Sequence, residues 1–182
     1  MKFEPLALSG VVHIELDVFR DGRGAFMETW QSEKYAAGGI ADSFVQDNWS
    51  ESAQGVLRGL HYQVQQPQGK LVAVVSGAIF DVVVDLRRSS PTFGRWVSER
   101  LSSERGSALW VPPGFAHGFF VESERATVLY KCTDFYAPAH ERTIRWDDPG
   151  LAIDWPLPPG TTPNLSPKDA KGLFVKDAET FV

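Results

Sequence analysis

The segment from Gly55 to Gln63, with the sequence GVLRGLHYQ, carries the first part of the pattern that determines the fold. Arg58 and His61 stand three positions apart in a run that is otherwise mostly Gly, Val and Leu. Because side chains alternate between the two faces of a regular strand, this spacing predicts that Arg58 and His61 point in opposite directions, unless a glycine breaks the alternation. Taken alone, the segment suits a surface arginine with a core histidine as well as a functional site.

Most of the remaining chain has the pattern of short β-strands. No stretch keeps the i, i+3, i+4 apolar spacing of an amphipathic helix beyond about three turns, whereas many short runs alternate or are rich in Val, Phe, Trp and Thr. Gly, Pro or Ser separates these runs from one another. The predicted strands span residues 11–19, 25–30, 43–50, 56–63, 70–75, 78–86, 96–101, 107–111, 118–121 and 127–133.

Only a few short helices are expected. Ser32 is predicted to cap one that runs through Ala37 and ends at two glycines, and a second short helical segment is predicted near residues 168–171. Closely spaced short strands, with the apolar runs LVAVV and FDVVVDL as central strands, favour two packed sheets and an all-β sandwich or barrel. No linker, repeat or low-complexity block divides the chain, so residues 1–182 are expected to form one domain.

Composition excludes several classes of function. The formal net charge of −5 and the pI near 5.4 argue against binding to nucleic acid or to a membrane surface, because both require a broad basic field. A single cysteine, Cys132, excludes an intramolecular disulfide. The first ten residues contain no long apolar run for export or membrane insertion, so we expect a cytoplasmic protein.

Two segments begin with a glycine and have the same spacing. Gly55 is followed after five residues by His61, and Gly106 is followed after five residues by PPGFAH, which ends at His117. These motifs resemble those of cupin proteins, and the resemblance implies a jelly roll, or double-stranded β-helix. Metal-binding cupins place His, His, Glu and His at the positions that His61, Gln63, Lys70 and His117 occupy here. Since an amide and an ammonium replace two of the four ligands, we expect a cupin without a metal.

A closer resemblance covers most of the chain, from Asp21 to Asp169. The motifs FVQDNWSES, GVLRGLHYQ, QGKLVAVVSG, DVVVDLRRSSPTFGRW, WVPPGFAHGF, VLYKCTDFYAP and LSPKD occur in this order. Together they resemble the dTDP-4-dehydrorhamnose 3,5-epimerase family. The resemblance implies a homodimeric enzyme of dTDP-L-rhamnose biosynthesis that acts on a dTDP-4-keto-6-deoxy sugar and uses no cofactor.

The catalytic residues that this resemblance implies suit the chemistry. Inverting C3 and C5 of a 4-keto sugar requires a base, an acid and a group that stabilises the enolate. By resemblance, His61 is the base, Asp169 orients its imidazole, and Tyr130 is the acid. Lys70, which occupies the position of a metal ligand in other cupins, would stabilise the oxyanion at C4.

The implied substrate contacts suit a nucleotide diphosphate sugar. Arg23 and Arg58 match pyrophosphate contacts, since a guanidinium can make paired bonds to phosphate oxygens. Tyr136 matches a residue that stacks on the thymine ring, and His117 is expected close to the sugar. The further contacts implied by resemblance are Glu28, Gln46, Asp47, Asn48, Glu141 and Lys168, with Lys70 at the sugar.

Alternatives of different classes stay open at this point. Relatives with the same residues include 3-epimerases and 5-epimerases of other dTDP-deoxysugar pathways, and the sequence does not determine which carbons are inverted. A ketoisomerase on the same substrate is disfavoured by the Tyr130 and LSPKD matches. A sugar-nucleotide-binding cupin without catalytic activity is disfavoured because a binder needs no base and acid together.

Overall fold

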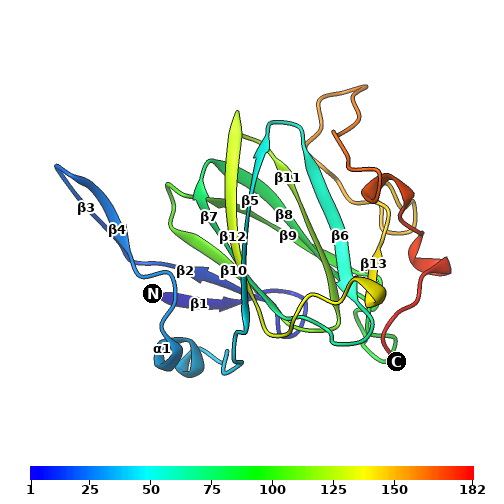
Figure 1. The fold of residues 1–182 in the computed structure, drawn as a ribbon, viewed down its shortest axis with the longest axis horizontal. Helices are drawn as coiled ribbons and strands as arrows, with labels where there is room; N and C mark the ends of the chain where they lie inside the picture. Colours follow the sequence, from blue (N-terminus) through cyan, green and yellow to red (C-terminus); the bar gives the residue numbers. More distant parts are fainter.

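Two antiparallel sheets packed face to face make up most of the molecule (Figure 1). The computed structural model describes residues 1–182. The six-stranded sheet has the order β1 (Lys2–Pro5), β2 (Val12–Glu15), β10 (Ser107–Val111), β7 (Lys70–Ser76), β12 (Arg125–Cys132) and β5 (Gln46–Ala53). The five-stranded sheet has the order β13 (Glu141–Thr143), β6 (Leu57–Gln63), β11 (Phe115–Val121), β8 (Ala78–Asp85) and β9 (Trp96–Ser102). The expected all-β, cupin-like jelly roll is confirmed.

The main core lies between the two sheets and follows from strand alternation. Val72 and Val74 of β7 face Ile79 and Val83 of β8, and all four are fully or almost fully buried. Because side chains two apart share a face, Lys70 continues the inward row of β7, and Asp81 lies between the two inward residues of β8. Charged side chains are thereby carried into the space between the sheets.

The outer faces are covered unequally. The segment after β13, which includes the 3-10 turns Asp169–Lys171 and Val175–Asp177, packs Trp155 and Ala178 on the outside of the five-stranded sheet. A third 3-10 turn, Pro138–His140, immediately precedes β13. Helix α1 (Ser32–Ala37) and its flanks cover part of the six-stranded sheet, with Tyr35 fully buried. The outside of β5 and β7 is left open, where Trp49 is 67% and Val75 is 56% exposed.

The predicted single strand over residues 11–19 is wrong. The amide of Leu16 donates to the carbonyl of Gly106, after which the chain leaves the sheet. The next residues form a separate two-stranded hairpin, β3 (Val18–Asp21) and β4 (Gly24–Met27), which projects from the body of the molecule (Figure 1). Alternation of apolar residues continues through this exit, so the sequence pattern does not reveal it.

The short helices are in the predicted places, with one correction. Gln31, not Ser32, caps α1, since its side-chain oxygen accepts a hydrogen bond of 2.6 Å from the amide of Lys34. The segment near residues 168–171 forms a single 3-10 turn. None of the helices has the length and apolar character needed to cross a membrane. Strands β1 and β13 were not predicted, because a run of four residues ending in proline and a run of three give little pattern.

Candidate active site

A cavity of about 350 Å³ opens between the two sheets. Its walls are mainly polar, which is unusual for the inside of a β-sandwich and indicates a binding site and not a packing defect. Both sheets and the segment after β12 contribute. The lining residues are Gln46, Asn48, Ser50, Arg58, His61, Gln68, Lys70, His117, Gly118, Phe119, Tyr130, Tyr136, Glu141 and Lys168.

A β-bulge brings Arg58 and His61 to the same cavity. Between β6 and β11, His117 is opposite His61 and Phe119 is opposite Arg58, so two residues of β6 face the single residue Gly118. The extra residue reverses the alternation, and the prediction that Arg58 and His61 point in opposite directions is therefore wrong. Both side chains line the cavity.

Glycines on both strands permit this close approach. Gly59 has a φ of +122°, and a Cβ built on it would lie 2.5 Å from the Cα of Gly118. A Cβ on Gly118 would lie 2.6 Å from the carbonyl oxygen of Arg58. Neither position has room for a side chain, so the two glycines are a condition for the geometry of the site.

His61 is paired with a buried carboxylate. Its Nε2 lies 2.5 Å from Oδ1 of Asp169, which comes from the 3-10 turn that follows LSP and is 3% exposed. Burial lowers the pKa of His61 below the ordinary histidine value, and the hydrogen bond and charge of Asp169 partly oppose this effect. An imidazole held in this way is unprotonated at neutral pH and has its Nδ1 free for a proton.

Tyr130 and Lys70 enter the cavity from the other sheet. Tyr130 lies on β12 and Lys70 on β7, and the two strands are hydrogen-bonded neighbours. Burial raises the pKa of Tyr130, so its hydroxyl keeps its proton at neutral pH. Burial lowers the pKa of Lys70. Its Nζ donates a hydrogen bond of 3.4 Å to the carbonyl oxygen of His61. His61 and Tyr130, the predicted base and acid, thus stand on opposite walls of the cavity.

The charged side chains that line the cavity favour an anionic ligand. Arg58 donates to Oγ of Ser52 at 2.9 Å and forms no ion pair with a carboxylate, so its charge is not neutralised. Among the lining residues, the cations Arg58, Lys70 and Lys168 face the single carboxylate Glu141. Such a site favours a ligand with negative charge.

A hydrogen-bonded chain forms the outer rim of the cavity. Glu141 accepts from the hydroxyl of Tyr136 at 2.9 Å and from Nζ of Lys168 at 2.8 Å. These two contacts lower the pKa of Glu141 against the effect of its burial. The ring of Tyr136 remains 51% exposed, and the backbone amide of Tyr136 donates to Gln46 at 2.9 Å. The rim thus presents an aromatic ring held by polar contacts.

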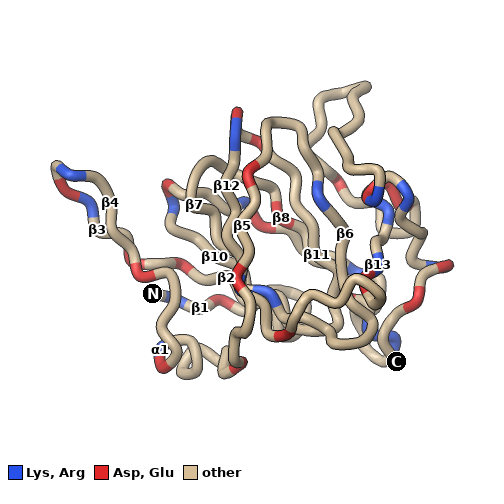
Figure 2. The backbone as a smooth tube through the Cα atoms, in the orientation of Figure 1, with Lys and Arg blue, Asp and Glu red and all other residues tan.

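Three of the predicted substrate contacts do not line this cavity. The side chain of Asp47 is on the other face of β5, where it pairs with Lys131 at 2.8 Å. Glu28 pairs with Lys34 at 2.7 Å. Arg23 lies on the projecting hairpin, where it pairs with Asp21 and its side chain is 92% exposed. Figure 2 shows the oppositely charged residues at the tip of this hairpin, away from the two sheets.

The donor set does not suit a transition metal. The amide of Gln63 is taken up by the backbone of Gln66, Phe135 and Ala137, and Lys70 presents an ammonium. His61 and His117 each already have Nε2 bound to an aspartate. No group of three His, Cys, Asp or Glu side chains is arranged to hold a metal ion.

Sequence reasoning missed Ser50 and Gln68, which line the cavity, and the aspartate that is paired with His117. Asp81 is fully buried and lies 2.9 Å from Nε2 of His117 through each of its oxygens. A signal was present, because an aspartate in the middle of the apolar run FDVVVDL is rare unless it is paired.

Comparison with known proteins agrees with this geometry. Residues 5–177 match the family model described as dTDP-4-dehydrorhamnose 3,5-epimerase. A protein of that description from Pseudomonas aeruginosa is 56% identical over 182 residues, which are 100% of this chain and 99% of that protein.

Solved structures give the same result. The crystal structure of dTDP-6-deoxy-D-glucose-3,5-epimerase from Legionella pneumophila, in complex with dTDP-4-keto-L-rhamnose, has a TM-score of 0.93 and 50% identity, covering 98% of this chain and 94% of that one. A 3′-monoepimerase from Streptomyces bikiniensis, in complex with dTDP-quinovose, has a TM-score of 0.88 and 34% identity. The match covers 95% of this chain and 87% of that one.

Proposed function

Because the chain belongs to the dTDP-4-dehydrorhamnose 3,5-epimerase family, we propose that the cavity between its two sheets is the active site, with His61 as the base and Tyr130 as the acid. The protein is an isomerase of dTDP-L-rhamnose biosynthesis. It epimerises C3 and C5 of dTDP-4-dehydro-6-deoxy-D-glucose and so forms dTDP-4-dehydro-L-rhamnose.

The placement of His61 and Tyr130 on different sheets carries this assignment. Epimerisation removes a proton from one face of the sugar and returns one to the other face. His61 comes from β6 and Tyr130 from β12, so a sugar bound between the sheets has a base on one side and a phenol on the other. A pocket that only bound the sugar would not need this opposition.

Asp169 serves the base. By accepting the Nε2 proton of His61, it selects the tautomer that leaves the Nδ1 lone pair available, and it stabilises the imidazolium that forms when His61 takes a proton from carbon. Proton transfer next to a ketone places negative charge on the C4 oxygen. Lys70 lies in the same cavity as a cation and stabilises that oxyanion.

Polar and charged side chains of the cavity and its rim bind the nucleotide. Arg58 has no competing carboxylate, so its guanidinium is free for the diphosphate. Lys168 and the Gln46–Asn48 pair add polar contacts, and the exposed ring of Tyr136 offers a surface for stacking on the base. Binding of these remote groups orients the sugar ring between His61 and Tyr130.

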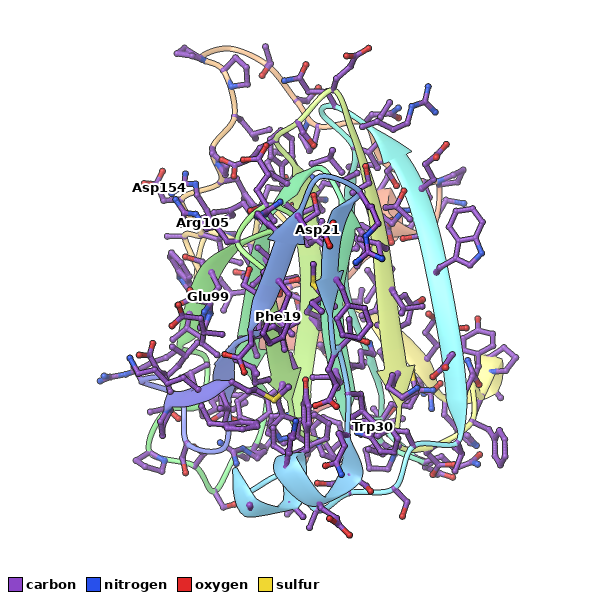
Figure 3. All side chains as sticks on the ribbon, turned by 90° about the vertical axis from the view of Figure 1, so that its left-hand side faces the viewer. Phe19, Asp21, Trp30, Glu99, Arg105 and Asp154 are labelled. Atoms are coloured by element: carbon purple, nitrogen blue, oxygen red, sulfur yellow. The ribbon has the colours of Figure 1, made fainter.

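We propose that the protein works as a homodimer in which the β3–β4 hairpin of each subunit reaches its partner. The hairpin carries the apolar side chains Phe19 and Phe26, which are 63% and 69% exposed. Viewed from its own side, the hairpin stands in front of the sheets, with Phe19 and Asp21 on it (Figure 3). Together with Trp49 and Val75 on the open face of the six-stranded sheet, it forms the apolar surface that a second copy would cover.

This assembly also accounts for Arg23. In its own subunit Arg23 stands on the far end of the hairpin and is not part of the cavity. A hairpin that crosses to a second copy would bring Arg23 and Glu28 to the partner's active site. Each site would then consist of residues from two subunits.

Following solvent deuterium in a dTDP-4-keto-6-deoxyglucose substrate tests the function. The 3,5-epimerase labels and inverts both C3 and C5, whereas a monoepimerase of another pathway inverts one of them. A ketoisomerase gives a 3-keto product, and a sugar-nucleotide binder gives no label. Nuclear magnetic resonance of the sugar distinguishes these four results in one sample.

A further inference from the structure

A second histidine-aspartate pair lies beside the first, and the histidine of each pair lines the cavity. His61 of β6 and His117 of β11 are directly opposite one another in the antiparallel pairing of their strands. Each uses Nε2 to contact an aspartate, His61 at 2.5 Å from Asp169 and His117 at 2.9 Å from both oxygens of Asp81. Two imidazoles in one sugar pocket therefore have the same ring nitrogen engaged, although their aspartates come from unrelated parts of the chain.

The Asp81 carboxylate is costly to bury. Its residue is 0% exposed, and Nε2 of His117 is its one hydrogen-bond donor. Besides His117, the charged groups that act on Asp81 are Lys70 in the cavity and Glu99, which is opposite Asp81 on β9 and lies 3.3 Å from Nδ1 of His13. Removing a carboxylate from water costs several kcal/mol, and a single N–H donor does not replace its hydration. Stability alone does not explain an aspartate at this position.

Asp85, four residues later on the same strand, provides a contrast. It is also 0% exposed, but it accepts hydrogen bonds from Arg87, Ser90 and Thr92, between 2.6 and 3.0 Å long. These contacts hold the turn after β8, and none of the residues involved lines the cavity. Asp85 is thus a fully satisfied structural carboxylate, and Asp81 is bound only to a residue of the active site.

We propose that Asp81 is a positioning residue for the epimerase reaction, which holds His117 as the Nε2–H tautomer and so presents the Nδ1 lone pair of His117 to a hydroxyl group of the bound sugar. The inference rests on the function proposed above. Asp81 does not line the cavity and acts on the reaction only through His117.

The free nitrogen supports this role. Nδ1 of His117 has no hydrogen-bond partner in the protein, and the atom is not buried. Because the ring lines the cavity, Nδ1 is accessible from it. Lys70 and Arg58 in the same cavity can only donate hydrogen bonds. A sugar hydroxyl beside the ketone is a donor and needs an acceptor, and Nδ1 of His117 supplies one on the wall that also carries the base.

The main test replaces Asp81 with asparagine. An amide has nearly the same shape as the carboxylate but can donate as well as accept, so it no longer imposes one tautomer on His117. We expect kcat to fall by about tenfold or more, with a small change in KM, because the nucleotide contacts remain. Asp85→Asn is the matched control: it should lower the melting temperature, while the kcat of the folded protein stays near that of the wild type.

Two further measurements separate positioning from a structural role. The chain has only four histidines, so the side-chain ¹⁵N signals can be assigned by substitution. In the wild type, His117 should carry its proton on Nε2, and in Asp81→Asn this preference should be lost. In addition, the double variant Asp81→Asn with His117→Gln should have the same kcat as His117→Gln alone, because Asp81 acts through His117.

The proposal is wrong if His117 in the wild type carries a proton on Nδ1, if Asp81→Asn retains full kcat, or if the losses of the two single variants multiply in the double variant. A wild-type protein that epimerises nothing would instead refute the proposed function. The tautomer of His117 would still be measurable in that case, so the two failures can be distinguished.

Discussion

His61 and Tyr130 face the same cavity from opposite sheets, His61 from β6 of the five-stranded sheet and Tyr130 from β12 of the six-stranded sheet. Under the proposed function, two different side chains therefore act on the two faces of a bound sugar. Removal of Tyr130 should leave proton abstraction by His61 in place, whereas removal of His61 should stop both steps, because no enolate then forms to be protonated.

Tyr130→Phe tests this division. The substitution keeps the ring that packs against the main core and removes only the hydroxyl proton. The enolate can still form through His61, so exchange with deuterium oxide should continue with retention of configuration, while inversion falls sharply, most clearly at C5. Label and stereochemistry at each carbon are followed by nuclear magnetic resonance. If exchange and inversion at C5 decline in proportion, Tyr130 is needed to form the enolate; if neither declines, another group is the acid.

Asp169→Asn tests the orientation of the base through the pH profile. Burial lowers the pKa of His61 below 6.5, and Asp169 raises it by hydrogen bond and charge. In the wild type, the acid limb of kcat/KM should therefore lie below pH 6.5. Removing the charge of Asp169 removes a contribution that favours the imidazolium, so the acid limb of kcat/KM should move to lower pH. The plateau value of kcat/KM should fall less than in a His61 variant. A limb that moves to higher pH contradicts this assignment.

Arg23 tests whether each active site contains residues of two subunits. The variants Arg23→Ala and His61→Asn should each be nearly inactive. In a mixed dimer one site combines an intact Arg23 with an intact His61, so co-expression should restore up to roughly a quarter of the wild-type activity, given random pairing. A mixture that stays inactive, or a single-subunit mass by light scattering, contradicts the crossed dimer.

Chelation tests the absence of a metal. Gln63 and Lys70 stand at two of the four cupin ligand positions, and Gln63 is committed to backbone contacts. Activity should therefore survive exhaustive dialysis against a chelator. Loss of activity that one divalent ion restores is the opposite result, and would show that His61 and His117 hold a metal after all.

The sequence revealed those parts of the site that depend on local motifs. His61, His117 and Lys70 follow from the cupin spacing, and the alternation of β7 and β12 turns Lys70 and Tyr130 inward. The all-β sandwich follows from the number and spacing of short apolar runs, and its jelly-roll form from the resemblance to the cupin motifs. Such features are determined within about ten residues of chain.

Features that depend on contacts between distant segments were missed. The bulge that brings Arg58 to the side of His61 exists because Gly59 meets Gly118, which is 59 positions further along the chain. The exit of the chain after Leu16 depends on a hydrogen bond to Gly106. The role of Asp81 depends on its pairing with His117 on a neighbouring strand. Alternation within one segment contains none of this information.

Deuterium exchange by the His61→Asn variant tests the central claim most directly. Asparagine keeps approximate size and polarity, and its amide can still contact Asp169, but it cannot accept a proton from carbon. We predict that exchange at both C3 and C5 in deuterium oxide falls by at least the ~10²-fold expected when a general base is lost, while the variant still binds dTDP and keeps its melting temperature. Exchange near the wild-type rate at either carbon would contradict the account, because another group would then remove that proton.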